Sequence, residues 1–105
     1  MLKITDTAIE CCADVGRIAR MVAEYDRSLA DQMRRAMASV ALNTSEGCGV
    51  SGGNARQRFR TALGSAREVE TALRVARAFG YVKEIDGALL NRLDRIRAVL
   101  WKVSR

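Results

Sequence analysis

A row of four arginines, spaced by four and seven residues, occurs at Arg56, Arg60, Arg67 and Arg74. On a helix these side chains project within about 40° of one another and follow each other at about 6 and 10 Å along the axis. Guanidinium groups pair bidentately with phosphate, and these separations are comparable to those between phosphates in nucleic acids. We call this set the arginine row, and it predicts phosphate-led contact with RNA or DNA.

A second interpretation of the arginine row involves no ligand. The four side chains are then solvated, or they pair with the acidic residues of the N-terminal segment. These are Asp6, Glu10, Asp14, Glu24 and Asp26.

A second group of polar residues recurs on one face of the segment before the glycine-rich stretch: Arg35, Ser39, Asn43 and Glu46. Arg35 and Glu46 are about 16 Å apart along a helix, so they cannot pair with each other. The segment ALGSAREVETAL offers complementary groups in Ser65, Glu68 and Glu70. We expect a structural polar network of Arg35, Ser39, Asn43, Glu46, Ser65 and Glu68, within or between protomers. The alternative is a solvated surface, because charged residues are rarely fully buried.

Catalytic and metal-binding chemistry has little support in this sequence. There is no histidine to act as a base or ligand, and the three cysteines, Cys11, Cys12 and Cys48, have no evident activating partner. The cysteines are interpreted as small apolar fillers. We therefore expect no enzyme activity, no metal and no cofactor.

The elements that carry these residues are predicted to be helices. The chain has 105 residues, no proline and few aromatic residues, which is typical of one all-α domain spanning 1–105. Apolar residues recur at spacings of three and four, and they predict an antiparallel up-down four-helix bundle. The expected helices are 3–24, 28–46, 54–79 and 84–103.

Local signals set these expected boundaries. Ser28 and Asp31 are interpreted as a variant of the capping box, and Gly47 is expected to end the second helix in a left-handed conformation. Asn54 is a suitable cap for the third helix, which is expected to end at Phe79 and Gly80.

The net charge of +6 is concentrated in the second half of the chain. Residues 1–26 carry three basic and five acidic groups, whereas residues 54–80 carry six and two. An acidic partner follows, either nucleic acid or protein, although arginine is also common in bacterial sequences of high GC content. With no apolar run long enough for export or a membrane span, the expected location is the cytoplasm, without a membrane partner.

Two large apolar residues are predicted to lie on one side of the fourth helix, away from its core stripe: Leu90 and Trp101. Exposed together they would form a costly patch in a monomer, so they predict an oligomer interface. The alternative is that Trp101 covers the end of the bundle.

Two stretches, QMRRAMASVALNTSEGCG and FRTALGSAREVETALRVARAFGYV, resemble the four-helix bundle proteins encoded in 23S ribosomal RNA intervening sequences. This bacterial family is related in fold to the accessory variability determinants of diversity-generating retroelements. The resemblance covers roughly residues 29–103, and its matching positions are Arg34, Arg35, Ala36, Ser39, Asn43, Glu46, Gly47, Phe59, Ala62, Leu63, Gly64, Ser65, Glu68, Glu70, Leu73, Gly80 and Tyr81.

The resemblance implies a homopentamer of four-helix protomers, no catalytic activity and a nucleic-acid-associated role. It leaves a second function open, in which the chain is a protein-interaction scaffold or an accessory subunit, for example a reverse-transcriptase partner in a retroelement. The N-terminal stretch MLKITDTAIE departs from the opening signature usual in the family, and EYDRSL stands where a Phe-Pro turn is usual. A truncated or divergent member with a shorter, less typical first helix is therefore expected.

Overall fold

The computed structural model describes residues 2–105, with side chains from Lys3 onward. Four helices account for nearly all of this part of the chain, and no strand occurs in it. They are α1 (Leu2–Ala23), α2 (Arg27–Cys48), α3 (Gly52–Ala78) and α4 (Gly87–Ser104). The protein is therefore an all-α four-helix bundle, with extents of 42 × 24 × 19 Å.

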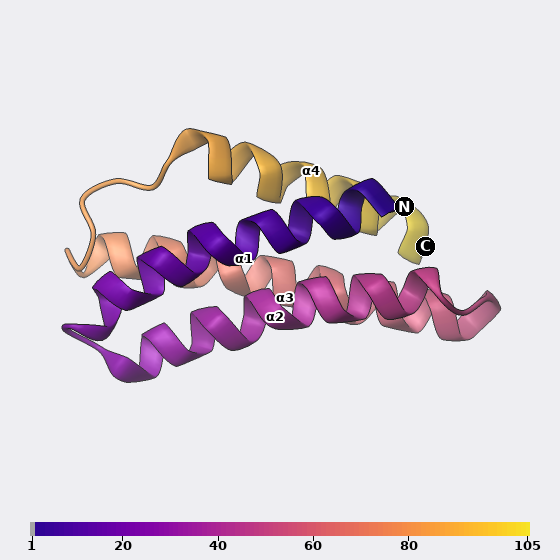
Figure 1. Ribbon diagram of the computed structural model, residues 1–105, viewed down its shortest axis with the longest axis horizontal. Coiled ribbons are helices and arrows are strands. Elements are labelled where there is room, and N and C mark those ends of the chain that lie inside the picture. Colours follow the sequence, from indigo (N-terminus) through magenta and orange to yellow (C-terminus); the bar gives the residue numbers. More distant parts are fainter. Residues whose placement is uncertain (1) are drawn as a thin grey trace.

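The helices lie side by side along the long axis of the bundle (Figure 1). The α1–α2 and α3–α4 connections lie at one end, and the α2–α3 connection lies at the other, toward which both termini point. Consecutive helices pack against each other, and α1 also packs against α4. Each helix therefore contributes one apolar stripe to a shared core.

Small and aliphatic side chains fill this core. Cys11, Val15 and Val22 of α1 meet Met33, Met37 and Val40 of α2, together with Val69 and Leu73 of α3 and Leu89, Leu93, Ile96 and Leu100 of α4, in one cluster of buried residues. Alanines separate many of these larger residues, so the helices pack closely, and Phe59 of α3 is the aromatic residue within the described core cluster.

The start of α2 differs from the expected capping box. Asp26, and not Ser28, is the N-cap, and its carboxylate accepts a hydrogen bond from the Leu29 backbone N–H at 2.9 Å. Asp31 instead pairs with Arg34 at 2.6 Å. Asp26 lies three residues before Leu29, the first buried residue of α2, so the free Leu29 N–H is within reach of its side chain.

The end of α2 also differs from expectation, because Gly47 lies inside the helix and is buried. The helix continues to Cys48, and Gly49 is its C-cap. The glycine is required by packing: a Cβ added at Gly47 would lie 2.5 Å from Cε1 of Phe59 on α3. The absent side chain therefore lets the phenyl ring lie directly against the α2 backbone.

The connections around α3 and α4 follow other local rules. Ser51 is the N-cap of α3 but makes no side-chain cap bond, and Asn54 lies within the helix. Gly80 takes a φ of +79° after α3, as a helix-ending glycine does. Asp86 caps α4 by accepting from the Ala88 N–H at 3.0 Å, so this helix begins three residues later than expected.

The two tyrosines of the chain close one end of the bundle. The rings of Tyr25 and Tyr81 stack in parallel with centroids 5.4 Å apart, and the Tyr81 hydroxyl donates to Oδ2 of Asp26 at 3.3 Å. This contact joins the α1–α2 turn to the α3–α4 connection. None of the described helices is long and apolar enough to cross a membrane.

Candidate nucleic-acid interface

All four members of the arginine row are exposed on α3: Arg56, Arg60, Arg67 and Arg74. Their spacing places them on one face of this helix, because residues four and seven apart return to nearly the same direction. Among the described residues, no ion pair involves any member of the row. Their charges are therefore available to an external anion.

The α4 side of the row contains a hollow with a volume of about 410 Å³. We call it the Trp101 hollow, and the residues that line it are Arg60, Leu63, Gly64, Arg67, Trp101, Ser104 and Arg105. Nε of Arg60 donates to the Ser104 carbonyl at 3.1 Å, which joins α3 to the last turn of α4. Three guanidinium groups and one indole thus border a single depression.

The indole of Trp101 is the aromatic wall of this hollow. Its residue is 54% exposed, and the Arg105 guanidinium carbon lies 5.8 Å from the ring centroid in a cation–π arrangement. Leu90 is less exposed than Trp101, because its side chain is half-buried against the bundle. The structure therefore places Trp101, which was expected at a subunit interface, in the same depression as two members of the arginine row.

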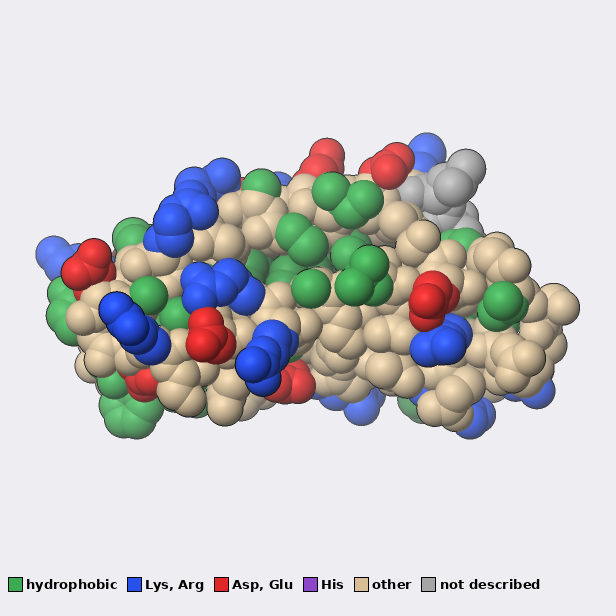
Figure 2. Space-filling view, turned by 60° about the horizontal axis from the view of Figure 1, so that its bottom comes forward, with side chains coloured by type: hydrophobic (Ala, Val, Ile, Leu, Met, Phe, Trp, Pro, Cys, Tyr) green, Lys and Arg blue, Asp and Glu red, His purple; other side chains and the backbone are tan. Residues whose placement is uncertain are grey.

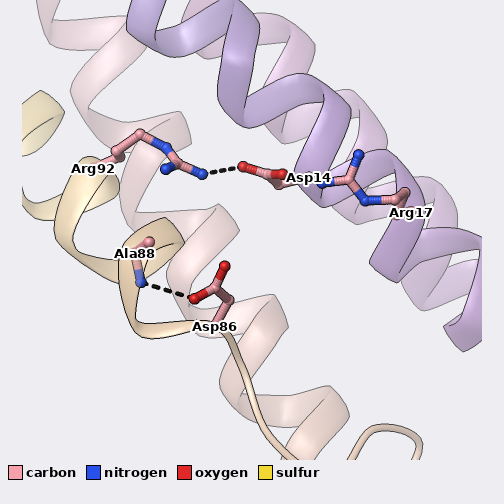
Figure 3. A network of polar contacts seen from close by, with 5 residues as sticks. All are labelled: Asp14, Arg17, Asp86, Ala88 and Arg92. Carbon is pink, nitrogen blue, oxygen red and sulfur yellow. Dashed lines mark hydrogen bonds and ion pairs between the residues drawn. The ribbon is translucent and has the colours of Figure 1, made fainter.

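The acidic residues of α1 do not pair with the arginine row in the part of the chain that the structure describes. Asp14 is the α1 acid engaged in ion pairs, and it contacts Arg17 on its own helix and Arg92 on α4 (Figure 3). In Figure 3, Arg92 reaches across from α4 toward Asp14, while Asp86 turns back to its own helix start. None of these contacts therefore neutralises the charge of the arginine row.

Arg92 also lies beside a buried thiol. Burial raises the pKa of the Cys11 thiol, and the nearby Arg92 guanidinium opposes this rise. Burial likewise raises the pKa of Cys12. Cys48 differs from the interpretation as an apolar filler, because it is exposed at the end of α2. The described residues contain no cluster of three or more metal-binding side chains.

Part of the predicted polar network is present between α2 and α3. The hydroxyl oxygens of Ser39 and Ser65 lie 2.7 Å apart, and Nδ2 of Asn43 donates to the Ser39 hydroxyl at 3.1 Å and to its carbonyl at 3.0 Å. All three residues are half-buried. They form a short hydrogen-bonded chain at the seam of the two helices.

The charged members of the predicted network lie elsewhere. Glu46 pairs with Arg58 on α3 at 3.2 Å, and both side chains are more than half exposed. Arg35 and Glu68 are exposed and make no hydrogen bond or ion pair with the described residues. Glu70 turns to α4, where it pairs with Arg97 at 2.7 Å. The α2–α3 ion pair therefore has its acid on α2 and its base on α3, opposite to the expected arrangement.

The face formed by α1 and α2 has a different character. Figure 2 shows apolar side chains gathered in its middle, with Lys and Arg side chains nearer the α1–α2 turn. Ile9 is 56% exposed on α1 and Leu42 is 66% exposed on α2. The Cys12 thiol of α1 also contacts the Met37 carbonyl of α2 at 3.8 Å. The middle of the α1–α2 face thus exposes apolar side chains, whereas α3 carries the exposed arginine row.

A family model described as 23S rRNA-intervening sequence protein matches residues 1–102 of the chain. The chain belongs to this family. The match begins at residue 1, so α1 falls within it despite its atypical sequence. A comparison with curated proteins finds no match.

The fold of this intervening-sequence family member is similar to a solved structure from Bacteroides thetaiotaomicron. That crystal structure, at 1.70 Å resolution, is of a protein of unknown function from the S23 ribosomal protein family. The TM-score is 0.83, the identity is 17%, and the match covers 97% of this chain and 98% of the other. At this identity the likeness concerns the fold.

Sequence reasoning missed several residues of the family member's surface. Arg58 and Arg105 were not singled out, although Arg105 follows Trp101 by four residues and so lies on the same helical face. The tyrosine stack had no local signal, because Tyr25 and Tyr81 are 56 positions apart and meet only when both connections lie at one end of the bundle.

Proposed function

We propose that this protein is a non-enzymatic, oligomeric bundle that binds RNA or DNA through phosphate contacts on its arginine row. One observation carries the proposal: four exposed arginines follow one face of α3, and none is engaged in an ion pair with the described residues. Guanidinium groups that are not engaged in an ion pair give up no internal charge pairing when they contact phosphate, and the contact releases counterions from the nucleic acid.

The proposed protomer is an antiparallel up-down bundle. The order of the contacts supports this, because Ser39 meets Ser65 while Glu46, seven residues later, meets Arg58, seven residues earlier. The α3–α4 pairs follow the same rule, with Arg60 near Ser104 and Glu70 near Arg97. Such a protomer presents the full length of α3 on its surface, which a phosphate track needs.

Assembly as a homopentamer is part of the proposal, and the α1–α2 face is the better candidate for its interface. A contact that buried Trp101 would also have to bury or pair Arg60, Arg67 and Arg105, which is costly without matching acids. Ile9 and Leu42 carry no such cost. Leu42→Glu is then expected to lower the mass measured by light scattering, and a mass that instead falls only with Leu90→Glu would return the interface to α4.

The experiment for nucleic-acid binding compares two triple variants with equal loss of charge. In the first, Arg56, Arg67 and Arg74 are changed to Gln; in the second, Arg20, Arg27 and Arg35. All six are exposed and outside the ion pairs of the described residues.

Fluorescence anisotropy with a labelled structured RNA at low salt is the measurement. We expect the first variant to lose most of the affinity and the second to retain most of it. Equal losses would assign binding to net charge alone. No binding by the wild type would favour a protein scaffold, with an acidic protein or a reverse transcriptase as its partner.

A further inference from the structure

The Trp101 hollow has a composition that the phosphate track alone does not require. Phosphate contacts need cations, yet this depression also exposes a large aromatic ring beside the helix backbone at Gly64. A Cβ added at Gly64 would meet no atom within 4 Å, so the space above this position is open. The hollow therefore combines charge with room for a flat apolar group.

An indole beside guanidinium groups suits a nucleotide with an unpaired base. Bases stack on exposed aromatic side chains in single-strand binding proteins, while arginines contact the neighbouring phosphates. A base within a duplex hides both of its faces in the stack, so it has no face to offer to Trp101. Inorganic phosphate would use the arginines and leave the indole bare.

The arginines of the hollow are arranged for such a ligand. Arg60 uses Nε to hold the Ser104 carbonyl, and its two terminal amino groups make no hydrogen bond with the described residues. Arg105 lies over the Trp101 ring, where it occupies the position that a planar base would take. A base that displaces Arg105 from the ring leaves its guanidinium beside Arg60 and Arg67, where a phosphate can be shared.

We infer that the Trp101 hollow is a binding site for an unpaired nucleotide of single-stranded RNA or DNA, with the base on Trp101 and its phosphate held by Arg60, Arg67 and Arg105. This rests on the proposed function and adds the class of nucleic acid. It gives the protein a preference for single strands over duplexes, at the α4 side of the arginine row.

The chain contains one tryptophan, so its emission reports on this site alone. The full-length protein is titrated with a single-stranded RNA oligonucleotide and with a fully paired RNA of equal length, and anisotropy follows binding independently. We expect the single strand to quench the emission and the duplex to leave it nearly unchanged at equal saturation.

Trp101→Leu is expected to weaken single-strand binding by about 5- to 100-fold, the range seen for loss of one stacking contact, and to change duplex binding less than about twofold. Trp101→Phe should keep most of the affinity. Phe79→Leu is the matched control, because Phe79 is 66% exposed at the other end of α3. Gly64→Leu places a side chain in the hollow while Trp101 itself is unchanged, and it should reproduce the loss.

The outcomes separate the two proposals. Equal affinity of Trp101→Leu and wild type for the single strand, or equal quenching by the duplex, would overturn the nucleotide site while leaving phosphate-led binding intact. Absence of binding to both RNAs at low salt would remove the proposed function itself.

Discussion

The ring of Phe59 on α3 lies where a side chain at Gly47 of α2 would stand, with Cε1, Cδ1 and Cζ all between 2.5 and 2.8 Å from the position of a Cβ. Phe59 is 7% exposed and belongs to the buried core. The contact joins the two helices near the α2–α3 connection, so it helps to set how closely α2 approaches the helix that carries the arginine row.

Gly47→Ala is therefore expected to destabilise the fold by about 1 to 3 kcal/mol, the usual cost of overpacking, despite the better helix propensity of alanine. Gly16→Ala is the matched control, because Gly16 lies in the middle of α1 with no atom within 4 Å of an added Cβ. It should be neutral or stabilising by up to about 1 kcal/mol. Urea unfolding followed by circular dichroism measures both, and equal effects would contradict the packing role of Gly47.

The hydrogen bond between Ser39 and Ser65 predicts coupling between α2 and α3. Each single change to Ala removes the bond between the two half-buried hydroxyls and should cost about 0.5 to 1.5 kcal/mol, with Ser39 still accepting from Asn43 in the Ser65 variant. The double variant should cost less than the sum. Arg35→Ala should change the free energy of unfolding of one protomer by less than about 0.5 kcal/mol. Additive serine effects in a double-mutant cycle would show that the hydroxyls act independently.

The two ion pairs of Asp14 are expected to contribute unequally to stability. The side chains of Asp14 and Arg92 are 19% and 27% exposed, whereas that of Arg17 is 60% exposed. Removing Arg17 should therefore cost at most about 1 kcal/mol. Asp14→Ala leaves the less exposed Arg92 without its charged partner and should cost about 1.5 to 3 kcal/mol. Thermal unfolding of the two variants makes the comparison, and a larger effect from Arg17→Ala would refute it.

The three cysteines are expected to react with a thiol reagent in a fixed order. Cys48 is exposed and should react first, whereas Cys11 is buried and Cys12 half-buried. Burial raises the pKa of Cys11 and Cys12 above their ordinary value of 9.0, so their reactive thiolates are scarce at neutral pH. Cys48→Ser should abolish the fast phase, and its persistence would contradict the assigned burial.

The same pKa shifts predict that the free energy of unfolding falls as pH rises into the alkaline range. A raised thiol pKa means that the folded state holds these protons more tightly than the unfolded state, so this contribution is complete below pH 9 and is lost as pH rises through the folded-state values. Cys11→Ala should flatten the alkaline decline in the free energy of unfolding.

Much of the fold follows from helical periodicity, because apolar residues spaced by three and four along α1, such as Ile4, Ala8, Cys11 and Val15, are buried in the core. The helix boundaries are harder to predict from the sequence. Asp26 and Ser28 both suit a cap, and the choice depends on which free N–H lies within reach. Gly47 reads as a helix end in sequence, since the need for a missing side chain arises only from Phe59 on another helix.

In the candidate site, too, features along one helix are predictable from the sequence and features between helices are not. Spacing along one helix predicts which arginines share a face, and the exposed row on α3 has the expected members. Relations between helices need the packing: the Trp101 hollow forms because the last turn of α4 lies beside Arg60, and no local pattern encodes that neighbour. Long arginine side chains also reach several acids, so the choice of Arg58 for Glu46 depends on interhelical register.

The most direct test of the central claim is the salt dependence of RNA binding, measured by anisotropy for the wild type and for Arg67→Gln. Each phosphate contact contributes about 0.7 to 0.9 to the slope of the logarithm of the association constant against the logarithm of salt concentration. Phosphate-led binding predicts that this negative slope is smaller in magnitude by about that amount in Arg67→Gln and unchanged in Arg35→Gln. An identical slope in all three proteins would contradict the arginine row as the phosphate track.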